Sequence, residues 1–235
     1  MVDGPMTASG TQLTLPFPLN ERCVFANFVP GSNGELVDRL QRNASDGRFS
    51  STWLWGATGK SHLLQATCQN HAQLGHAVAY LPLADIGGQI ESIRGLSGHS
   101  LVAVDDLEVW LGNESLEEAL LTLYQDLYAT GNSLLLASLS APAETTFALP
   151  DLGSRFRSSN CHRVMPLDDD DKAQVLKQHA ATRGLLLAEP VLSFWLSRSD
   201  RSLQGLLAQL DKVDRAAMEA QRRVTVALLK QVLGL

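Results

Sequence analysis

A glycine-rich loop constrains the fold of this chain more than any other feature of its sequence. Residues 56–61 (Gly-Ala-Thr-Gly-Lys-Ser) follow an apolar run, 51–55, and lead into a stretch of helical periodicity, 61–72. Glycines allow backbone N–H groups to curl around a phosphate, the lysine adds positive charge, and the serine hydroxyl can hold Mg²⁺. The loop therefore predicts a phosphate site between a buried strand and the N-terminus of a helix.

This loop is shorter than most loops of its type. The common pattern is Gly-x-x-x-x-Gly-Lys-Ser/Thr, whereas here only Ala57 and Thr58 separate the glycines, and Leu54 takes the place of the first one. A shorter loop offers fewer backbone N–H groups and encloses less of a phosphate. We expect phosphate binding at this loop, but weak binding of a nucleotide.

An apolar segment that ends in two acids is the second motif. Residues 101–104 (Leu-Val-Ala-Val) lead directly into Asp105 and Asp106. In phosphoryl-transfer proteins such a strand delivers one carboxylate toward Mg²⁺, and a second acid beside it orients water. Two acids can also be a solvated strand end. In combination with the loop, they predict that Ser61 and Asp105 would hold Mg²⁺ together with a nucleotide.

Apolar segments alternate with helical patterns along most of the chain. Further strands are predicted at 77–81, 101–104, 133–137 and 161–164, and a helix at 116–129 that ends at Gly131-Asn132. Apolar strands bounded by helices indicate a parallel sheet covered on both faces. After Met165-Pro166 only helices are expected, at 172–183, 201–222 and 225–233. The predicted fold class is therefore α/β, a parallel sheet sandwiched by helices, followed by a small all-helical domain.

The predicted domain boundaries follow from these patterns. Residues 1–22 form a flexible tail, 23–165 the α/β domain and 166–235 the helical domain. The acidic run 168–171 is expected to cap the helix after it and to interact with the helix dipole, rather than to bind metal.

Charge and composition narrow the class of partner. The chain has 19 Lys and Arg against 25 Asp and Glu, whereas a protein that grips DNA by itself usually carries a basic patch. No apolar run reaches the ~18 residues of a membrane span, and no basic segment followed by an apolar one begins the chain. Cys23, Cys68 and Cys161 lack metal-ligand spacing. We expect a cytoplasmic protein with protein partners and no membrane role.

Five segments, in this order, resemble sequence boxes of the DnaA/Hda subfamily of AAA+ proteins, and most closely those of its shorter, Hda-type members. They are 25–33, 54–64, 102–106, 149–156 and 210–222. The resemblance spans about residues 12–235. It implies an AAA+ nucleotide-binding domain followed by a helical lid, with adenine nucleotide and Mg²⁺ as cofactors. The positions that it places at the nucleotide are Gly56, Thr58, Gly59, Lys60, Ser61 and Phe28.

The resemblance also implies a mechanism in trans. Residues 12–17 are similar to a peptide that binds the sliding clamp of DNA polymerase, and Pro16 would limit the chain entropy lost on docking. On the clamp, and so on DNA only indirectly, the protein would promote hydrolysis of DnaA-bound ATP and oppose re-initiation. Arg155 matches an arginine finger, which can accelerate phosphoryl transfer by roughly 10³-fold or more. The clamp-binding positions are Gln12, Leu13, Leu15, Pro16 and Phe17.

Departures from the family pattern concern the chain's own nucleotide site. Leu139 stands where a polar sensor is common, and Gln204 where a lid arginine usually reaches the nucleotide. With the short loop, these departures predict weak binding of nucleotide, ADP rather than ATP, and slow or absent turnover. The chain also ends after the lid, without room for a DNA-reading helix-turn-helix, and this favours the Hda type. An autonomous ATPase and a DnaA-like factor in replisome loading remain alternatives, and the family also admits a homo-oligomer.

Overall fold

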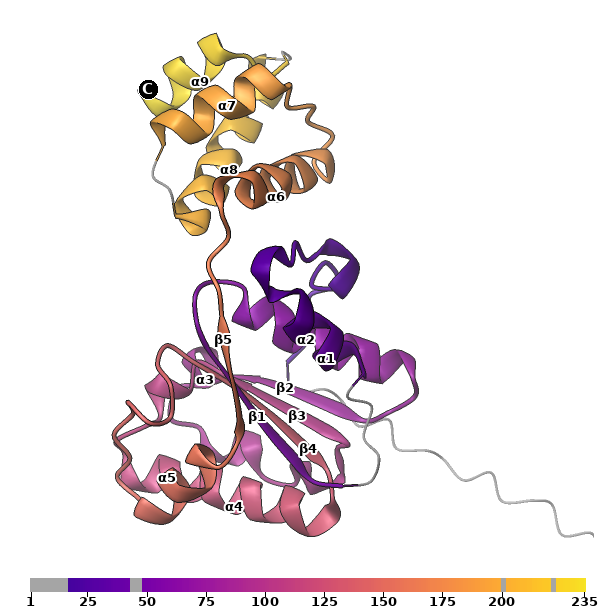
Figure 1. Ribbon diagram of the computed structural model, residues 1–235, viewed down its shortest axis with the longest axis vertical. Coiled ribbons are helices and arrows are strands. Elements are labelled where there is room, and N and C mark those ends of the chain that lie inside the picture. The colour runs from indigo at the N-terminus through magenta and orange to yellow at the C-terminus, as the bar shows by residue number, and fades with distance from the viewer. Residues whose placement is uncertain (1–16, 43–47, 200–201, 221–222) are drawn as a thin grey trace, which may run out of the picture.

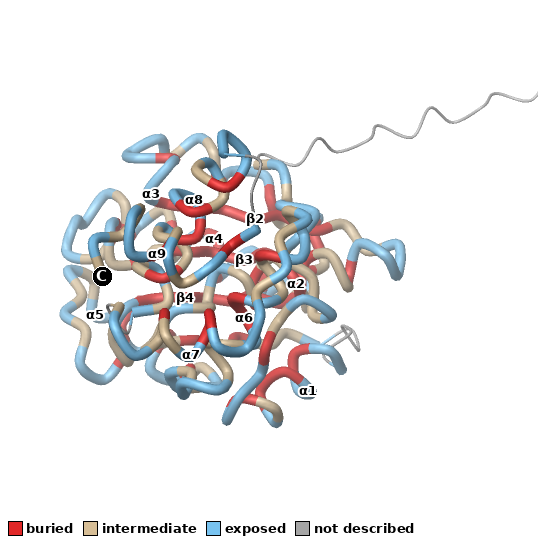
Figure 2. Tube along the Cα trace, turned by 90° about the horizontal axis from the view of Figure 1, so that it is seen from above, coloured by how far each residue is buried: buried red, intermediate tan, exposed pale blue. Residues whose placement is uncertain are grey.

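The structure is a computed structural model that describes residues 17–42, 48–199, 202–220 and 223–235. It contains an α/β domain and a helical domain, joined by the chain that leaves the last strand (Figure 1). This architecture confirms the predicted fold class. Viewed from above, the buried residues follow the strands and the inner faces of the helices (Figure 2).

Five parallel strands form one sheet in the order β2-β3-β4-β1-β5. Their bounds are Ser50–Gly56 (β1), Val78–Pro82 (β2), Leu101–Asp105 (β3), Ser133–Ser138 (β4) and Asn160–Val164 (β5). Each predicted strand is present, with ends that differ by a residue. Because the carboxyl ends of parallel strands lie at one edge of the sheet, the loop after β1 and the two acids at the end of β3 lie at the same edge, with β4 between the two strands.

Helices cover both faces of the sheet, as the apolar strands require. On one face lie α1 (Gly34–Arg42) and α2 (Lys60–Gln73); on the other lie the short α3 (Leu83–Ile86), α4 (Glu114–Thr130) and α5 (Pro150–Arg157) (Figure 1). Short 3-10 helices are Phe25–Asn27, Gly31–Asn33, Ile90–Ile93, Leu96–Gly98 and Leu107–Val109.

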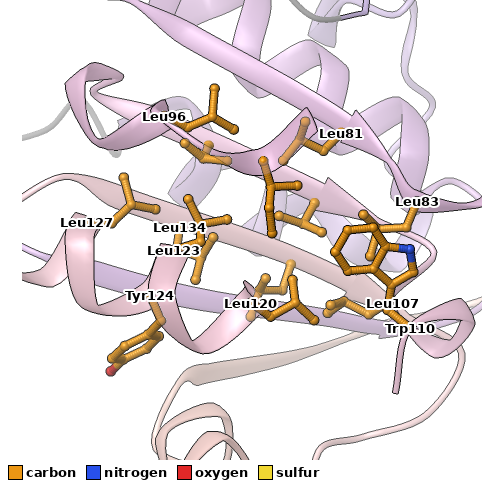
Figure 3. Packing of buried hydrophobic residues seen from close by; sticks show 14 of the residues in the cluster. Leu81, Leu83, Leu96, Leu107, Trp110, Leu120, Leu123, Tyr124, Leu127 and Leu134 are labelled. Carbon is orange, nitrogen blue, oxygen red and sulfur yellow. The ribbon is translucent and has the colours of Figure 1, made fainter. Parts of the chain in front are cut away.

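Two hydrophobic cores result from the alternation of side chains along the strands. Trp53 of β1 is buried in the core beneath α4 and α5, whereas the adjacent Leu54 is buried in the core beneath α1 and α2. Figure 3 shows the first of these cores between α4 and the sheet, with Tyr124 at its margin. As predicted, α4 ends at Gly131, which adopts the left-handed conformation with φ 71°.

The helical domain has a third core of its own, centred on the buried Trp195. Its helices are α6 (Asp169–Ala181), α7 (Glu189–Arg198), α8 (Leu203–Ala220) and α9 (Val226–Leu233). The acidic run caps α6 as expected, because Asp168 and Asp171 form a reciprocal capping box. The helix nevertheless begins at Asp169 and not at Lys172, since three of the acids occupy its first turn. None of the described helices is both long and apolar enough to cross a membrane.

Candidate nucleotide site and the helix of Arg155

The phosphate loop depends on the backbone freedom of its two glycines. Gly56 has φ 100° and Gly59 has φ 109°, a left-handed region that side chains disfavour. A Cβ atom at Gly56 would lie 2.9 Å from the carbonyl oxygen of Val164, on the neighbouring strand β5. The glycines therefore allow both the curl of the loop and its close approach to β5.

Lys60 is directed back into its own loop. Its Nζ donates hydrogen bonds to the carbonyl oxygens of Gly56, at 3.0 Å, and Ala57, at 3.1 Å. The N–H group of Ala57 is also engaged, since it donates to Val164 O at 3.1 Å. At the start of α2, the N-cap residue Gly59 provides no side-chain cap, so the N–H groups of the first turn are available to an anion. The short loop thus keeps the helix terminus as an anion site but uses part of its own donors internally.

The acidic strand end is held by local hydrogen bonds. Asp105 is 2% exposed; its Oδ2 accepts from the Tyr80 hydroxyl at 2.8 Å and its Oδ1 from the N–H of Asp106 at 3.0 Å. Burial and the Asp105 charge raise the pKa of Tyr80, so the phenol remains a donor. Among the described residues, Asp106 alone has a positive φ without being glycine, at 54°.

Asp106 lies in a field of like charges. Burial, followed by the charges of Asp105, Glu108 and Asp85, raises the pKa of the Asp106 carboxyl, and the Lys60 ammonium partly opposes this shift. The positive charge of Lys60 therefore acts on Asp106, one of the two acids predicted to function with the phosphate loop. A bound cation or phosphate-linked Mg²⁺ would relieve the repulsion among the acids.

The two predicted protein ligands of Mg²⁺ are oxygen donors at this edge of the sheet. Ser61 is exposed at the start of α2, and Asp105 supplies a carboxylate; both are hard oxygen donors of the kind that Mg²⁺ takes. Within the described part of the chain, no group of three or more His, Cys, Asp or Glu residues could hold a metal by itself. The donor set suits a cation that shares its coordination with nucleotide phosphates.

A cavity of about 250 Å³ separates the α/β domain from the helical domain. Its walls come from the N-terminal segment, the loop, the interdomain linker and helices α6 and α8. They include Phe28, Thr58, Gly59, His62, Leu167, His179 and Gln204. The Phe28 ring lies 5.3 Å from the His62 ring and so close to Gly59 that a Cβ there would be 3.3 Å away. Phe28 thus lies against the phosphate loop at Gly59, and both line the interdomain cavity near the N-terminus of α2.

Arg155 lies elsewhere, in the last turn of α5. Its Nε is 3.2 Å from both carboxylate oxygens of Asp151, and its guanidinium carbon is 5.4 Å from the centroid of the Tyr124 ring. The side chain remains 34% exposed. Because α5 and α2 cover opposite faces of the sheet, Arg155 is not directed at the chain's own phosphate loop (Figure 1).

Comparison with known proteins gives one family match, within the helical domain, and several matches of fold. Residues 169–233 match the family model described as Hda, lid domain. The fold is similar to domain III of the replication initiation protein DnaA from Thermotoga maritima, with a TM-score of 0.78 and 21% identity over 93% of this chain and 98% of that one. The chain has the AAA+ fold of DnaA domain III and an Hda-type lid over residues 169–233. The predicted resemblance to DnaA and Hda is thereby confirmed.

Two further solved structures have a fold similar to that of this chain. AMPPCP-bound DnaA from Aquifex aeolicus matches with a TM-score of 0.70 and 19% identity, over 86% of this chain and 68% of that one. The RuvB Holliday junction branch migration motor from Thermotoga maritima matches with a TM-score of 0.63 and 13% identity, over 86% and 68% respectively. At these identities the likeness concerns the fold.

Two positions at which this AAA+ protein departs from the family pattern have different surroundings. Leu139 follows β4 and its side chain is 63% exposed; its N–H donates to Glu108 at 3.2 Å, and its carbonyl accepts from the N–H of Gly56 at 3.4 Å. Gln204 of α8 lines the interdomain cavity. A neutral amide, rather than a guanidinium, therefore faces the cavity from this point of the lid.

The predicted clamp-binding peptide lies mostly outside the described residues. Gln12, Leu13, Leu15 and Pro16 belong to that undescribed part. Phe17 is described, is partly buried and packs against both cores of the α/β domain. Beyond it the chain runs along α2, where the Asn20 N–H donates to Gln65 at 2.9 Å.

Asn33 and Gly31 have roles that sequence reasoning missed. The Asn33 side chain, 4% exposed, bonds both to its own 3-10 helix at Pro30 and to the backbone of Met165 in the interdomain linker. Gly31 lies against Asp171 and Leu167, which leave no room for a Cβ. Both residues were in the segment that resembles the family's first box, but the contacts that give them a role come from residues far along the chain.

Proposed function

We propose that this AAA+ protein regulates the initiation of DNA replication by promoting hydrolysis of ATP bound to DnaA, while it is held on the DNA-loaded sliding clamp. The observation that carries the proposal is Arg155, a partly exposed arginine on the sheet face opposite the chain's own phosphate loop. The match of residues 169–233 to the Hda lid supports it. Conversion of the initiator's bound ATP to ADP would oppose re-initiation.

The surroundings of Arg155 suit a residue that changes partners. At rest its guanidinium lies against the Asp151 carboxylate and over the Tyr124 ring. A helical ion pair of this spacing contributes only about 0.5 kcal/mol when exposed. A finger that accelerates phosphoryl transfer by roughly 10³-fold lowers the barrier by about 4 kcal/mol. Exchange of the carboxylate for a neighbour's γ-phosphate is therefore strongly favoured in the transition state, where negative charge moves onto the phosphoryl oxygens.

The chain's own site supports a regulatory use of nucleotide more than rapid turnover. Lys60 bonds to loop carbonyls, Asp105 bonds to Tyr80, and the exposed Leu139 side chain offers no polar contact to a γ-phosphate. Bound adenine nucleotide, ADP rather than ATP, would lie between Phe28 and the lid, with its phosphates at the start of α2. Mg²⁺, when bound with it, would neutralise phosphate charge, with Ser61 and Asp105 as protein ligands.

The proposed tether consists of Gln12, Leu13, Leu15, Pro16 and Phe17. Apolar anchors on an extended segment fit a hydrophobic groove, and the proline reduces the entropy that docking costs. Phe17 packs on the α/β domain, so the last residue of the proposed tether is fixed to that domain. A clamp bound by this tether would raise the effective concentration of the finger near a second protein on the same clamp.

The test is hydrolysis of DnaA-bound ATP in the presence of the purified chain. The expected result is a large rise in rate that requires both the chain and a clamp loaded on DNA. A free clamp, or DNA without clamp, serves as the control and should give little stimulation. An unchanged rate with all components present would refute the proposal.

A second candidate, an autonomous ATPase, is favoured by one observation. Asp105, Asp106 and Lys60 lie at the same edge of the sheet, and the Lys60 charge acts on the Asp106 carboxyl, an arrangement that a hydrolytic site could use. This alternative predicts steady phosphate release by the isolated chain, and loss of that release in Asp105→Ala. Release without DnaA that disappears in the variant would establish it.

A further inference from the structure

Resting on the proposed role of Arg155, we infer that Glu117 of α4 is the positioning residue that fixes the helix of the finger. Its side chain is 0% exposed. Oε1 accepts hydrogen bonds from the N–H groups of Gly112, at 2.7 Å, and Ala148, at 3.0 Å, and Oε2 accepts from the N–H of Leu149 at 2.7 Å. One buried carboxylate thus joins the turn that leads into α4 to the backbone at the start of α5, about 30 residues later.

A carboxylate buried at this position costs desolvation free energy and provides acceptors for backbone N–H groups. Buried charges are unfavourable unless hydrogen bonds compensate them, and charge-assisted bonds from backbone N–H groups do so effectively. Glu117 also lies in the first turn of α4, where the helix dipole favours negative charge. An apolar side chain here would fill the core next to Leu120 but would leave the three N–H groups without their acceptor.

The residues bonded to Glu117 include the start of α5. Leu149 is the N-cap of this eight-residue helix, and it provides no side-chain cap of its own. Pro150 follows, so the first turn is entered with restricted backbone geometry. The helix is further fixed by the buried Leu152 and Phe156 and by the close approach of Gly153 to Phe147. A hold on Leu149 therefore sets the direction in which Arg155 projects from a short, rigid element.

Helix α4 contacts both ends of α5. Glu117 holds the N-terminal end, and Tyr124 lies beneath the Arg155 guanidinium near the C-terminal end. These residues stand at i and i+7 of α4, and so on one face of it. The third bond, from Gly112, attaches the loop that follows the acidic strand end to the same carboxylate. The geometry needed by a trans-acting guanidinium is thus set by α4.

Hydrogen exchange on the full chain tests whether Glu117 fixes the start of α5, and it requires no activity assay. Glu117→Gln replaces one acceptor oxygen by an NH₂ group that faces an N–H donor, and should accelerate exchange across residues 148–157 by at least tenfold, with α8 unchanged. Glu118→Gln, the exposed neighbour on α4, should leave both regions unchanged. If Glu117→Gln does not fold, Glu117→Asp takes its place, since it keeps the charge and shortens the reach. Unaltered exchange over 148–157 in a folded variant would overturn the inference.

Stimulated hydrolysis then tests whether the hold acts through Arg155. Glu117→Gln should lower the maximal rate on DnaA-bound ATP at least tenfold, with no change in the concentration that gives half-maximal stimulation. In the Arg155→Ala background it should cause no further loss, because no guanidinium remains to be misplaced. An equal loss in both backgrounds would reduce Glu117 to a general structural role and contradict the inference. If the wild-type chain gives no stimulation, the proposed function fails, and hydrogen exchange alone decides whether Glu117 fixes α5.

Discussion

The side-chain amide of Asn33 bonds to both backbone polar groups of Met165, the residue at which the α/β domain passes into the lid. Asn33 Oδ1 accepts from the Met165 N–H at 2.7 Å, and Nδ2 donates to the Met165 carbonyl at 3.1 Å. A second bond from Nδ2 reaches Pro30 O at 3.0 Å. The amide therefore pairs with the backbone directly after β5 and attaches the linker to the segment beside the cavity.

Asn33→Ala should loosen this junction. Loss of the amide leaves partly buried backbone groups without partners, at a cost of about 1–3 kcal/mol. We expect a lower urea midpoint for unfolding and faster proteolysis at the linker. Ser32→Ala, at an exposed neighbouring position, serves as the control and should leave both unchanged. Equal midpoints for the Asn33 variant and the wild type would show that the linker is held by other contacts.

Two glycine substitutions should change stability in opposite directions. Gly56→Ala places a Cβ against the Val164 carbonyl at a φ of 100°, and should cost more than about 1 kcal/mol. Gly34→Ala, in open space at the start of α1, should instead stabilise by about 0.5 kcal/mol. Thermal unfolding of the two variants beside the wild type measures the difference. A destabilised Gly34→Ala or a neutral Gly56→Ala would contradict the described backbone.

Asp106→Asn should stabilise the protein at neutral pH. The pKa of Asp106 is raised in the folded state, so the folded chain holds this proton more tightly than the unfolded chain does. As pH rises from the ordinary aspartate pKa through the raised one, stability is therefore lost. Asparagine removes the repulsion and tolerates the left-handed backbone. Because the carboxyl is partly exposed and its repulsion is screened, we expect a gain of about 0.5 kcal/mol.

The pH dependence provides the control for this prediction. The difference in unfolding midpoint between Asp106→Asn and the wild type should shrink as the pH falls below the ordinary aspartate pKa, where both carry no charge at this position. A difference that stays constant across pH would assign the effect to backbone preference alone.

Substitutions at two positions of the proposed clamp-binding peptide should have different effects on the stability of the fold. Leu15→Ala should abolish binding to immobilised clamp without changing the unfolding midpoint. Phe17→Ala should weaken binding and also destabilise the fold by about 1–2 kcal/mol, because the ring packs, only partly buried, against both cores. Clamp binding that survives Leu15→Ala would remove the tether from the account.

The elements with strong local signals were predictable from sequence. The strands around Trp53 and Val102 are apolar runs between turn signals, and Gly131 ends α4 by its backbone conformation. The sequence pattern places the start of α6 too late, at Lys172 and not at Asp169, because acids that can precede a helix as a cap are also favourable within its first turn.

The contacts between distant segments were not predictable in the same way. The sequence marks Glu117 as a polar residue within the apolar stripe of α4, which is an anomaly, but nothing local reveals that Ala148 and Leu149 bring their N–H groups to it. The same holds for Asn33 and Met165, whose pairing depends on where the last strand leaves the sheet. Such partners are determined by the tertiary fold.

Arg155 gives the most direct measurement of the central claim. Hydrolysis of DnaA-bound ATP on a DNA-loaded clamp should be compared for the wild type, Arg155→Ala and Arg157→Ala, the last a control on the same helix whose guanidinium lies 5.2 Å from the Phe147 ring. A trans-acting finger predicts a loss of at least ~100-fold for Arg155→Ala with clamp binding intact, and a near wild-type rate for Arg157→Ala. Full stimulation by Arg155→Ala would contradict it.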